Sequence, residues 1–358
     1  MRSDRIEIEK ESKKSELQKF FEKTTIRSFD SSSLLSIKTS LEGGNTAAEQ
    51  YLKINLWDPI EVIGEGGFST VYKVRNMRLE SNEKFYAAKV MRLTETNRLW
   101  VKNCLKNEMY ISKLLKHPNI VMTYKLFKTS LYGVIIMQYC PNGNIKSDMQ
   151  QRCGPYDPLE AIQFFHNLID GLLHIHQMNI AHRDLKLENF FLDETRKPLI
   201  GDFGFAIIGS GKILPTENKL LRYTRCGSEG YMAPEILEIT QQNKGSKSYD
   251  AKKADIYSMG VCFYEMINFV LPINQTNTQV VVVDDNDDHN RASIISLNSK
   301  LSDLELNKAQ HSDSGVREQL QNLIKSMLNI KPNKRPNALA IKMQTSILSQ
   351  LSANTIMD

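Results

Sequence analysis

The sequence predicts a two-lobed α+β protein in which a small antiparallel sheet precedes a mainly helical lobe. Strand-like segments occupy the region before residue 141, and segments with helical periodicity dominate after residue 155. The two types of segment do not alternate as they would in a parallel βαβ sheet. With 358 residues, of which 41% are hydrophobic and 24% charged, the chain is long enough for two lobes.

The strand-rich part starts with "DPIEVIGEGGFSTVYKVRNM" at 58–77. Apolar and polar residues alternate there on both sides of a glycine cluster, which is typical of two strands joined by a turn. Further strands are expected at 84–93 and 132–139, and 97–116 has the spacing of one main helix. The segment "CPNGN" at 140–144 then interrupts the pattern.

The helical part starts at Asp157, a helix cap followed by Pro158 at the first helical position. Residues 250–269 are apolar nearly all round, as in a buried central helix, and 316–351 predict two more helices.

We expect disorder in the tail at residues 1–55, with a helix around 6–23 as the alternative, and a short C-terminal tail at 346–358.

Composition excludes several classes of function. The net charge of +5 comes without any run of five Lys or Arg, so nothing argues for a nucleic-acid partner. Five scattered cysteines favour neither a disulfide framework nor a zinc site. The N-terminus has no signal peptide, and the most apolar segment, 255–270, is short for a membrane span and carries two acidic residues. We therefore expect no membrane span and a cytoplasmic protein, with a nuclear location left open.

The glycine cluster "GEGGFSTVYKV" at 64–74 fits more than one phosphate-binding pattern. A dinucleotide fold needs a helix after the glycines, but a strand-like segment follows, and a P-loop needs a Gly-Lys-Ser/Thr sequence that is absent. A strand–turn–strand lid, whose glycines let backbone N–H groups approach phosphate oxygens, requires a lysine on the next strand and a carboxylate on the next helix. Lys89 and Glu108 meet these two requirements.

At this point the sequence resembles the eukaryotic protein kinases. "AHRDLKLENFFL" at 181–192 matches the catalytic loop of that family. "DFG" at 202–204 matches its metal-binding motif, and "YMAPE" at 231–235 matches the end of its activation segment. The resemblance implies the two-lobed protein kinase fold over 56–345, with an N-lobe at 56–140 and a C-lobe at 141–345.

The resemblance also implies ATP and Mg²⁺ as cofactors and a set of catalytic residues. Asp184 would accept the proton of the substrate hydroxyl, and Lys186 would neutralise the γ-phosphate. Lys89, held by Glu108, would orient the phosphates, and Asn189 and Asp202 would hold the metal. The implied nucleotide-binding residues are Ile63, Gly64, Glu65, Gly66, Gly67, Phe68, Ser69, Val71, Ala87, Lys89, Met137, Gln138, Cys140, Asn144, Asn189 and Asp202.

Further positions concern specificity and control. Lys186, with Ser228 in the family's hydroxyl position, favours transfer to serine and threonine of protein substrates. Arg183 would bind a phosphate on Thr224, added by an upstream kinase or by autophosphorylation in trans; an unmodified Thr224 is the alternative. By the same resemblance Glu235 pairs with Arg335, and Asp255 bonds backbone N–H groups of the catalytic loop. Glu188 and Glu265 match positions that favour a basic residue near the phosphoacceptor, whereas Asn144 weakens that inference.

Two alternatives to an active kinase site concern other classes of protein. A catalytically silent, kinase-fold scaffold is suggested by Ser112, which stands where the family has a leucine-like residue. Metal sites are not supported: His166, His174 and His176 are read as ordinary helix residues, and the acidic run at 280–290 lacks the glycine and glutamate of a calcium loop.

Overall fold

Five strands of the N-terminal part pair into one antiparallel sheet, in the order β1-β2-β3-β5-β4. The computed structural model describes residues 46–66, 69–78, 84–93, 98–128, 132–209, 220–240, 247–272 and 314–355. The strands are β1 (Trp57–Glu65), β2 (Ser69–Asn76), β3 (Phe85–Arg92), β4 (Thr123–Lys128) and β5 (Tyr132–Gln138). They belong to a first compact unit, 1–116 with 121–140, and a second unit comprises 117–120 and 141–358.

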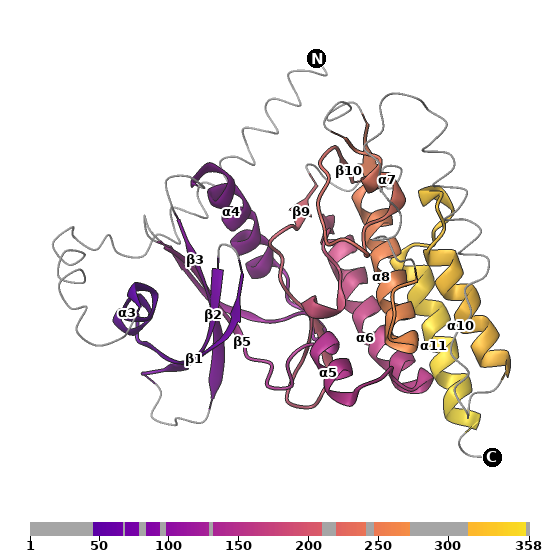
Figure 1. The fold of residues 1–358 in the computed structure, drawn as a ribbon, viewed down its shortest axis with the longest axis horizontal. Helices are drawn as coiled ribbons and strands as arrows, with labels where there is room; N and C mark the ends of the chain where they lie inside the picture. The colour runs from indigo at the N-terminus through magenta and orange to yellow at the C-terminus, as the bar shows by residue number, and fades with distance from the viewer. Residues whose placement is uncertain are drawn as a thin grey trace. The chain divides into compact units, whose positions relative to one another are not determined.

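Two helices pack on opposite faces of this sheet (Figure 1). Helix α3 (Ala47–Ile54) contributes Tyr51 and Leu52 to one core, and helix α4 (Arg98–Leu114) contributes Leu105 and Met109 to the other. Successive strand residues point to opposite faces, so neighbours along a strand enter different cores. In β3, for example, Val90 joins the α3 side, and Met91 the α4 side.

Helix α3 lies inside the segment that the sequence assigned to a disordered tail, and this part of the prediction is corrected. A capping box starts the helix: Glu49 N–H donates to Thr46 Oγ1 at 3.3 Å, and Thr46 N–H donates to Glu49 Oε2 at 2.9 Å. Burial of Tyr51 and Leu52 then stabilises the short helix from the tertiary side. The alternative helix at 6–23 lies outside the described residues.

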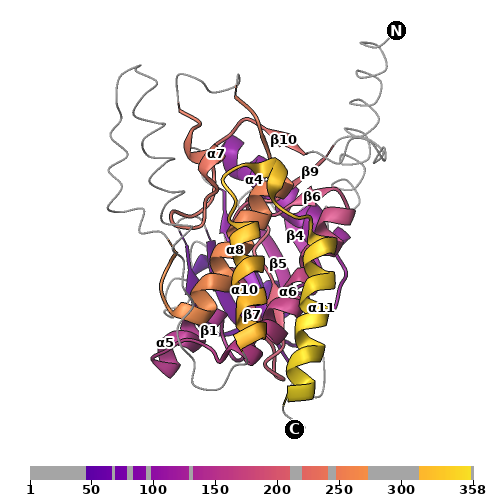
Figure 2. The same cartoon turned by 90° about the vertical axis from the view of Figure 1, so that its right-hand side faces the viewer.

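The second unit is mainly helical. Its helices are α5 (Ile145–Arg152), α6 (Pro158–Gln177), α7 (Pro234–Leu237), α8 (Ala251–Asn268), α10 (Ser314–Met327) and α11 (Ala338–Thr355), with short 3₁₀ turns η1 (Leu187–Asn189) and η2 (Pro332–Lys334). Helix α8 is buried on nearly every side, α6 and α10 pack against it, and α11 packs against α6 and α10 (Figure 2). The α+β class predicted from the sequence is confirmed.

Three two-stranded ribbons complete the second unit and position its loops. They pair β6 (Ile180–Ala181) with β9 (Ile207–Ile208), β7 (Phe190–Leu192) with β8 (Pro198–Ile200), and β10 (Leu221–Arg222) with β11 (Tyr249–Asp250).

Residues 117–120, placed in the N-lobe from sequence, group with the second unit instead. The cause is visible in hydrogen bonds: Ile200 N–H donates to Asn119 O at 2.9 Å, and Asn119 Nδ2 donates to Asn167 Oδ1 at 3.2 Å.

Candidate active site

The lysine and glutamate predicted from spacing form an ion pair within the first unit. Lys89 lies on β3 and shares a sheet face with Met91, which faces α4. Glu108, buried on α4, accepts a hydrogen bond from Lys89 Nζ at 2.7 Å. Since the lysine is itself only slightly exposed, this carboxylate determines where the ammonium group points.

The glycine cluster forms the turn between β1 and β2. Gly64 pairs with Val71 and Glu65 with Thr70, and Gly66 N–H donates to Ser69 O at 2.8 Å. A Cβ added at Gly64 or Gly66 would meet its nearest protein atom at 3.7 or 3.5 Å, an ordinary contact. The fold itself therefore has room for a side chain at both positions, so contacts within the described residues do not require glycine there. Gly67 and Phe68 lie outside the described residues.

The other predicted nucleotide residues of the first unit lie next to one another on the sheet. Ala87 pairs with Met137 across β3 and β5, while Gln138 N–H donates to Met122 O at 2.8 Å. The backbone N–H of Gln138 is thus used inside the unit. Cys140, at the end of this unit, is half-buried and forms no disulfide, and Ile63 is exposed.

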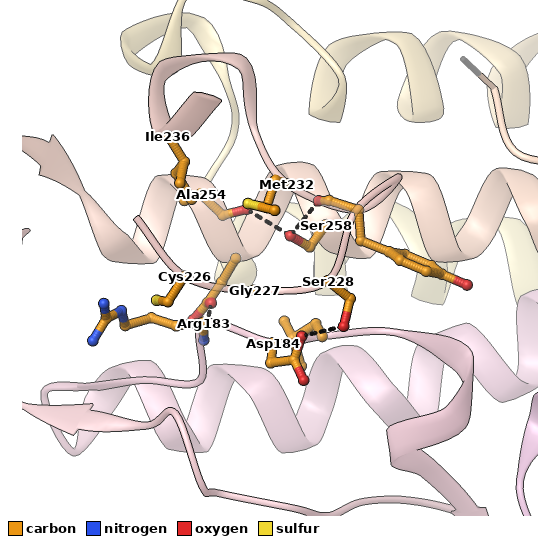
Figure 3. A pocket seen from close by; sticks show the side chains of 12 residues that line it. Arg183, Asp184, Cys226, Gly227, Ser228, Met232, Ile236, Ala254 and Ser258 are labelled. Carbon is orange, nitrogen blue, oxygen red and sulfur yellow. Dashed lines mark hydrogen bonds between the residues drawn. The ribbon is translucent and has the colours of Figure 1, made fainter. Parts of the chain in front are cut away.

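In the second unit, the predicted catalytic residues are joined by hydrogen bonds. Ser228 Oγ donates to Asp184 Oδ1 at 2.8 Å (Figure 3). The same hydroxyl accepts from Lys186 Nζ at 2.7 Å. Asn189 Nδ2 donates to Asp184 O at 2.8 Å and to Asp184 Oδ2 at 3.3 Å. The buried Asp184 carboxylate is therefore held in one orientation, with an ammonium group 3.4 Å from it.

The loop that carries Asp184 is anchored by the central helix. Asp255 of α8 accepts from the backbone N–H of His182 at 2.9 Å and of Arg183 at 2.8 Å, as the resemblance implied. His176 of α6 contacts the same carboxylate at 3.0 Å. These bonds hold Arg183 in a left-handed conformation, with φ of 69°, that is uncommon for a side-chain-bearing residue.

Asp202 also has left-handed backbone geometry, with φ of 57°, and it is exposed. Its Oδ1 accepts from Gly204 N–H at 3.3 Å, while the neighbouring Phe203 is buried against the ring of His182. An exposed carboxylate next to a buried anchor is suited to meet a ligand. Carboxylate and amide oxygens, which Asp202 and Asn189 offer, are the donors that Mg²⁺ prefers.

Comparison with known proteins decides the family. The protein kinase domain model matches residues 57–346, most of the chain. The chain belongs to the protein kinase domain family.

Several curated proteins are similar to this kinase domain. CBL-interacting protein kinase 26 of Oryza sativa subsp. japonica is 30% identical over 215 residues, covering 60% of this chain and 40% of that protein. The probable cell cycle serine/threonine-protein kinase CDC5 homolog of Encephalitozoon cuniculi is 33% identical over 221 residues, covering 61% and 43%. Serine/threonine-protein kinase PLK2 of Mus musculus is 30% identical over 217 residues, covering 61% and 29%. Each alignment spans less than half of the relative.

In the activation segment of this kinase domain, Thr224 contacts Arg183, and Arg222 lies two positions earlier in the chain. Arg183 Nη2 donates to Thr224 Oγ1 at 2.7 Å and to Thr224 O at 3.3 Å. Arg222 donates to the carbonyls of Leu221 and Ile208, and burial together with the charge of Arg183 lowers its pKa. Within the described part of the chain, neither arginine has a carboxylate partner.

Tyr249 takes part in the same cluster, and sequence reasoning missed it. Its hydroxyl donates to Thr224 O at 3.1 Å and accepts from Arg183 Nε at 3.2 Å, and burial raises the pKa of this phenol. The pairing of β10 with β11 places it there. Short strand-like sequence at 249–250 gives no local signal for this contact.

The remaining predicted residues have structural partners. Arg335 forms two hydrogen bonds with the carboxylate of Glu235, at 2.6 and 2.7 Å. Asn144 caps α5, since its Oδ1 accepts from Ser147 N–H at 2.8 Å.

No group of three or more His, Cys, Asp or Glu within the described residues could hold a metal ion. No helix formed by the described residues is long and apolar enough to cross a membrane.

Proposed function

We propose that this chain is an ATP- and Mg²⁺-dependent protein kinase that phosphorylates serine and threonine. One observation carries the proposal: the hydroxyl of Ser228 bridges Asp184 and Lys186, at 2.8 and 2.7 Å, inside a chain of the kinase family. A positioned carboxylate beside an ammonium group can accept a proton from a substrate hydroxyl while the positive charge stabilises the phosphoryl group in transfer.

Each residue then has a definite task in the transfer. Asp184 takes the proton as the substrate oxygen forms its bond to the γ-phosphorus and the bond to ADP breaks. Lys186 stabilises the charge on the phosphoryl oxygens, and Lys89, oriented by Glu108, binds the remaining phosphates. Asn189 and Asp202 would hold Mg²⁺, which neutralises phosphate charge when bound.

Substitution of the proposed base tests this function. Asp184→Asn keeps the size of the side chain and an oxygen that accepts from Ser228, so the fold should persist. Phosphate transfer from radiolabelled ATP to a mixture of proteins should fall by about 10²–10⁴-fold. Asp58→Asn, on β1 and remote in sequence from the catalytic loop, is the control and should retain activity. Absence of transfer by the wild type would instead favour the silent scaffold suggested by Ser112, and equal transfer above background by the wild type and Asp184→Asn would refute the role of Asp184.

We also propose that phosphorylation of Thr224 activates the kinase. Arg183 supports this: it donates to Thr224 Oγ1 and has no carboxylate partner within the described residues, so a phosphate on Thr224 would give it a counter-ion. Phosphatase treatment should lower kcat/KM by about tenfold or more, the effect of one hydrogen bond to a charged group. Thr224→Ala should have low activity that phosphatase does not change. A fully active Thr224→Ala would refute the proposal.

A cytoplasmic location is also proposed. It rests on the scattered cysteines, of which Cys153, Cys226 and Cys262 form no disulfide, as in reducing compartments. Microscopy of the chain fused to a fluorescent protein tests it, and exclusive location in an oxidising compartment would contradict it.

A further inference from the structure

A buried carboxylate of the second unit already has a partner for each of its oxygens. Glu265 of α8 is 1% exposed. Lys146 of α5 donates from Nζ to its Oε1, and the Tyr231 hydroxyl donates to its Oε2 at 2.6 Å. The sequence had suggested that Glu265 selects a basic residue in the substrate, so the presence of an internal cation at this carboxylate bears directly on substrate choice.

A second carboxylate is that of Glu188, and Glu265 and Glu188 are together called the acidic group here. Its Oε2 is buried, and no hydrogen-bond partner for it exists within the described residues. Tyr231 contacts Glu265 directly, and burial, with smaller contributions from Cys262, Glu265 and Glu188, raises the pKa of the Tyr231 hydroxyl. Tyr231 in turn lines the pocket that contains Asp184 and Ser228. The acidic group therefore lies beside the catalytic segment.

Lys146 reaches this group from the surface. Its side chain is 30% exposed, whereas Glu265 is enclosed. The Lys146 ammonium group therefore contacts the buried Glu265 carboxylate from the solvent side. A lysine or arginine of a bound peptide would make the same type of contact. A basic peptide side chain at Glu265 would compete with the ammonium group of Lys146 for this carboxylate, since Lys146 already neutralises its charge and Tyr231 donates to its other oxygen.

We propose that Lys146 is a specificity-determining residue: it occupies the place of a basic substrate side chain at Glu265 and thereby removes this carboxylate from substrate selection. The inference rests on the proposed kinase activity and narrows its substrates to protein segments that need no basic residue at that position. Lys146 is not adjacent in sequence to any catalytic motif, and the pairing with Glu265, which lies 119 positions later, is evident only in three dimensions.

Peptides that differ at one residue test the proposal. A series carries a single Arg placed in turn at each position upstream of the phosphoacceptor, and each peptide is compared with its Ala counterpart. In the wild type the Arg-to-Ala ratio of kcat/KM should be near unity at the position that meets Glu265. In Lys146→Met the ratio at that position should rise about tenfold or more, since the peptide would now supply a hydrogen bond to a charged group.

Two further variants serve as controls. Lys146→Arg keeps the positive charge and should keep the ratio of the wild type. In the double variant Lys146→Met/Glu265→Gln, the gain should disappear. A ratio of two kcat/KM values cancels a general loss of activity or of folded protein. An unchanged ratio in Lys146→Met would overturn the proposal, as would a wild-type preference for Arg that Glu265→Gln abolishes.

Failure of the proposed function gives a different result. If the wild type phosphorylates none of the peptides, the kinase proposal fails, and the role of Lys146 is then measured by binding. Fluorescence anisotropy with labelled Arg and Ala peptides should show tighter binding of the Arg peptide to Lys146→Met only. Equal affinities of both peptides for Lys146→Met would overturn the inference.

Discussion

Replacement of Arg335 by Met should destabilise the second unit far more than the same change at a surface arginine. The Arg335 side chain is 0% exposed, and its guanidinium holds Glu235 through two hydrogen bonds of 2.6 and 2.7 Å. It also donates to three backbone carbonyls, those of Asn329, Lys253 and Ile330, at 2.7, 2.9 and 3.3 Å. Every donor direction of the group is therefore used inside the protein.

The magnitude follows from what the substitution leaves behind. Glu235 is only 14% exposed, so Met at position 335 would leave a largely buried carboxylate without its counter-ion. Breaking a buried ion pair from one side costs about 3–5 kcal/mol. Arg75 is the matched control: it pairs with Asp58 at 2.9 Å, but the two side chains are 35% and 28% exposed. Arg75→Met should cost about 0–1 kcal/mol.

Urea denaturation followed by two probes separates the units. Both tryptophans, Trp57 and Trp100, belong to the first unit, so their fluorescence reports its unfolding. Far-UV circular dichroism is dominated by helices, and most helices of the described residues lie in the second unit. Arg335→Met should shift the dichroism transition to markedly lower urea. If its shift is no larger than that of Arg75→Met, the reasoning from burial is wrong.

Three further outcomes are expected. Glu108→Gln removes the charge that orients Lys89 and should lower kcat/KM about tenfold or more, with the urea midpoint as a check on folding. Ser228→Ala removes two hydrogen bonds in the catalytic cluster and should lower kcat by roughly ten- to a hundredfold; an unchanged kcat would show that the bridge is dispensable. Burial lowers the pKa of His117 and His166, so below the ordinary value of about 6.5 the unfolded chain binds more protons than the folded one. Stability should thus be full above that pH and fall as the pH drops towards the lowered values. The denaturation midpoint of a His117→Gln/His166→Gln variant should lack this fall, and an equal fall in both proteins would contradict the reasoning.

Local signals in the sequence accounted for most of the secondary structure near the site. The Asp157–Pro158 start of α6 was predicted, and Asp157 Oδ1 accepts from Leu159 N–H at 2.9 Å. The Lys89–Glu108 pair followed from a strand followed by a helix at suitable spacing. Helix α3 was missed although its capping box, Thr46 with Glu49, is readable in the sequence, because the charged segment before it suggested disorder.

The sequence by itself determined which chemical groups this protein has for phosphate transfer. The motifs around Asp184 and Asp202 are short, and the covalent chain fixes the separation of the residues within each motif. Only the tertiary structure decided several other polar contacts. Tyr249 reaches Thr224, and Lys146 reaches Glu265, across long stretches of chain. Such contacts depend on how helices and ribbons pack. The interaction between two polar groups is appreciable only within a few ångströms, and the sequence pattern does not show which distant residues folding brings that close.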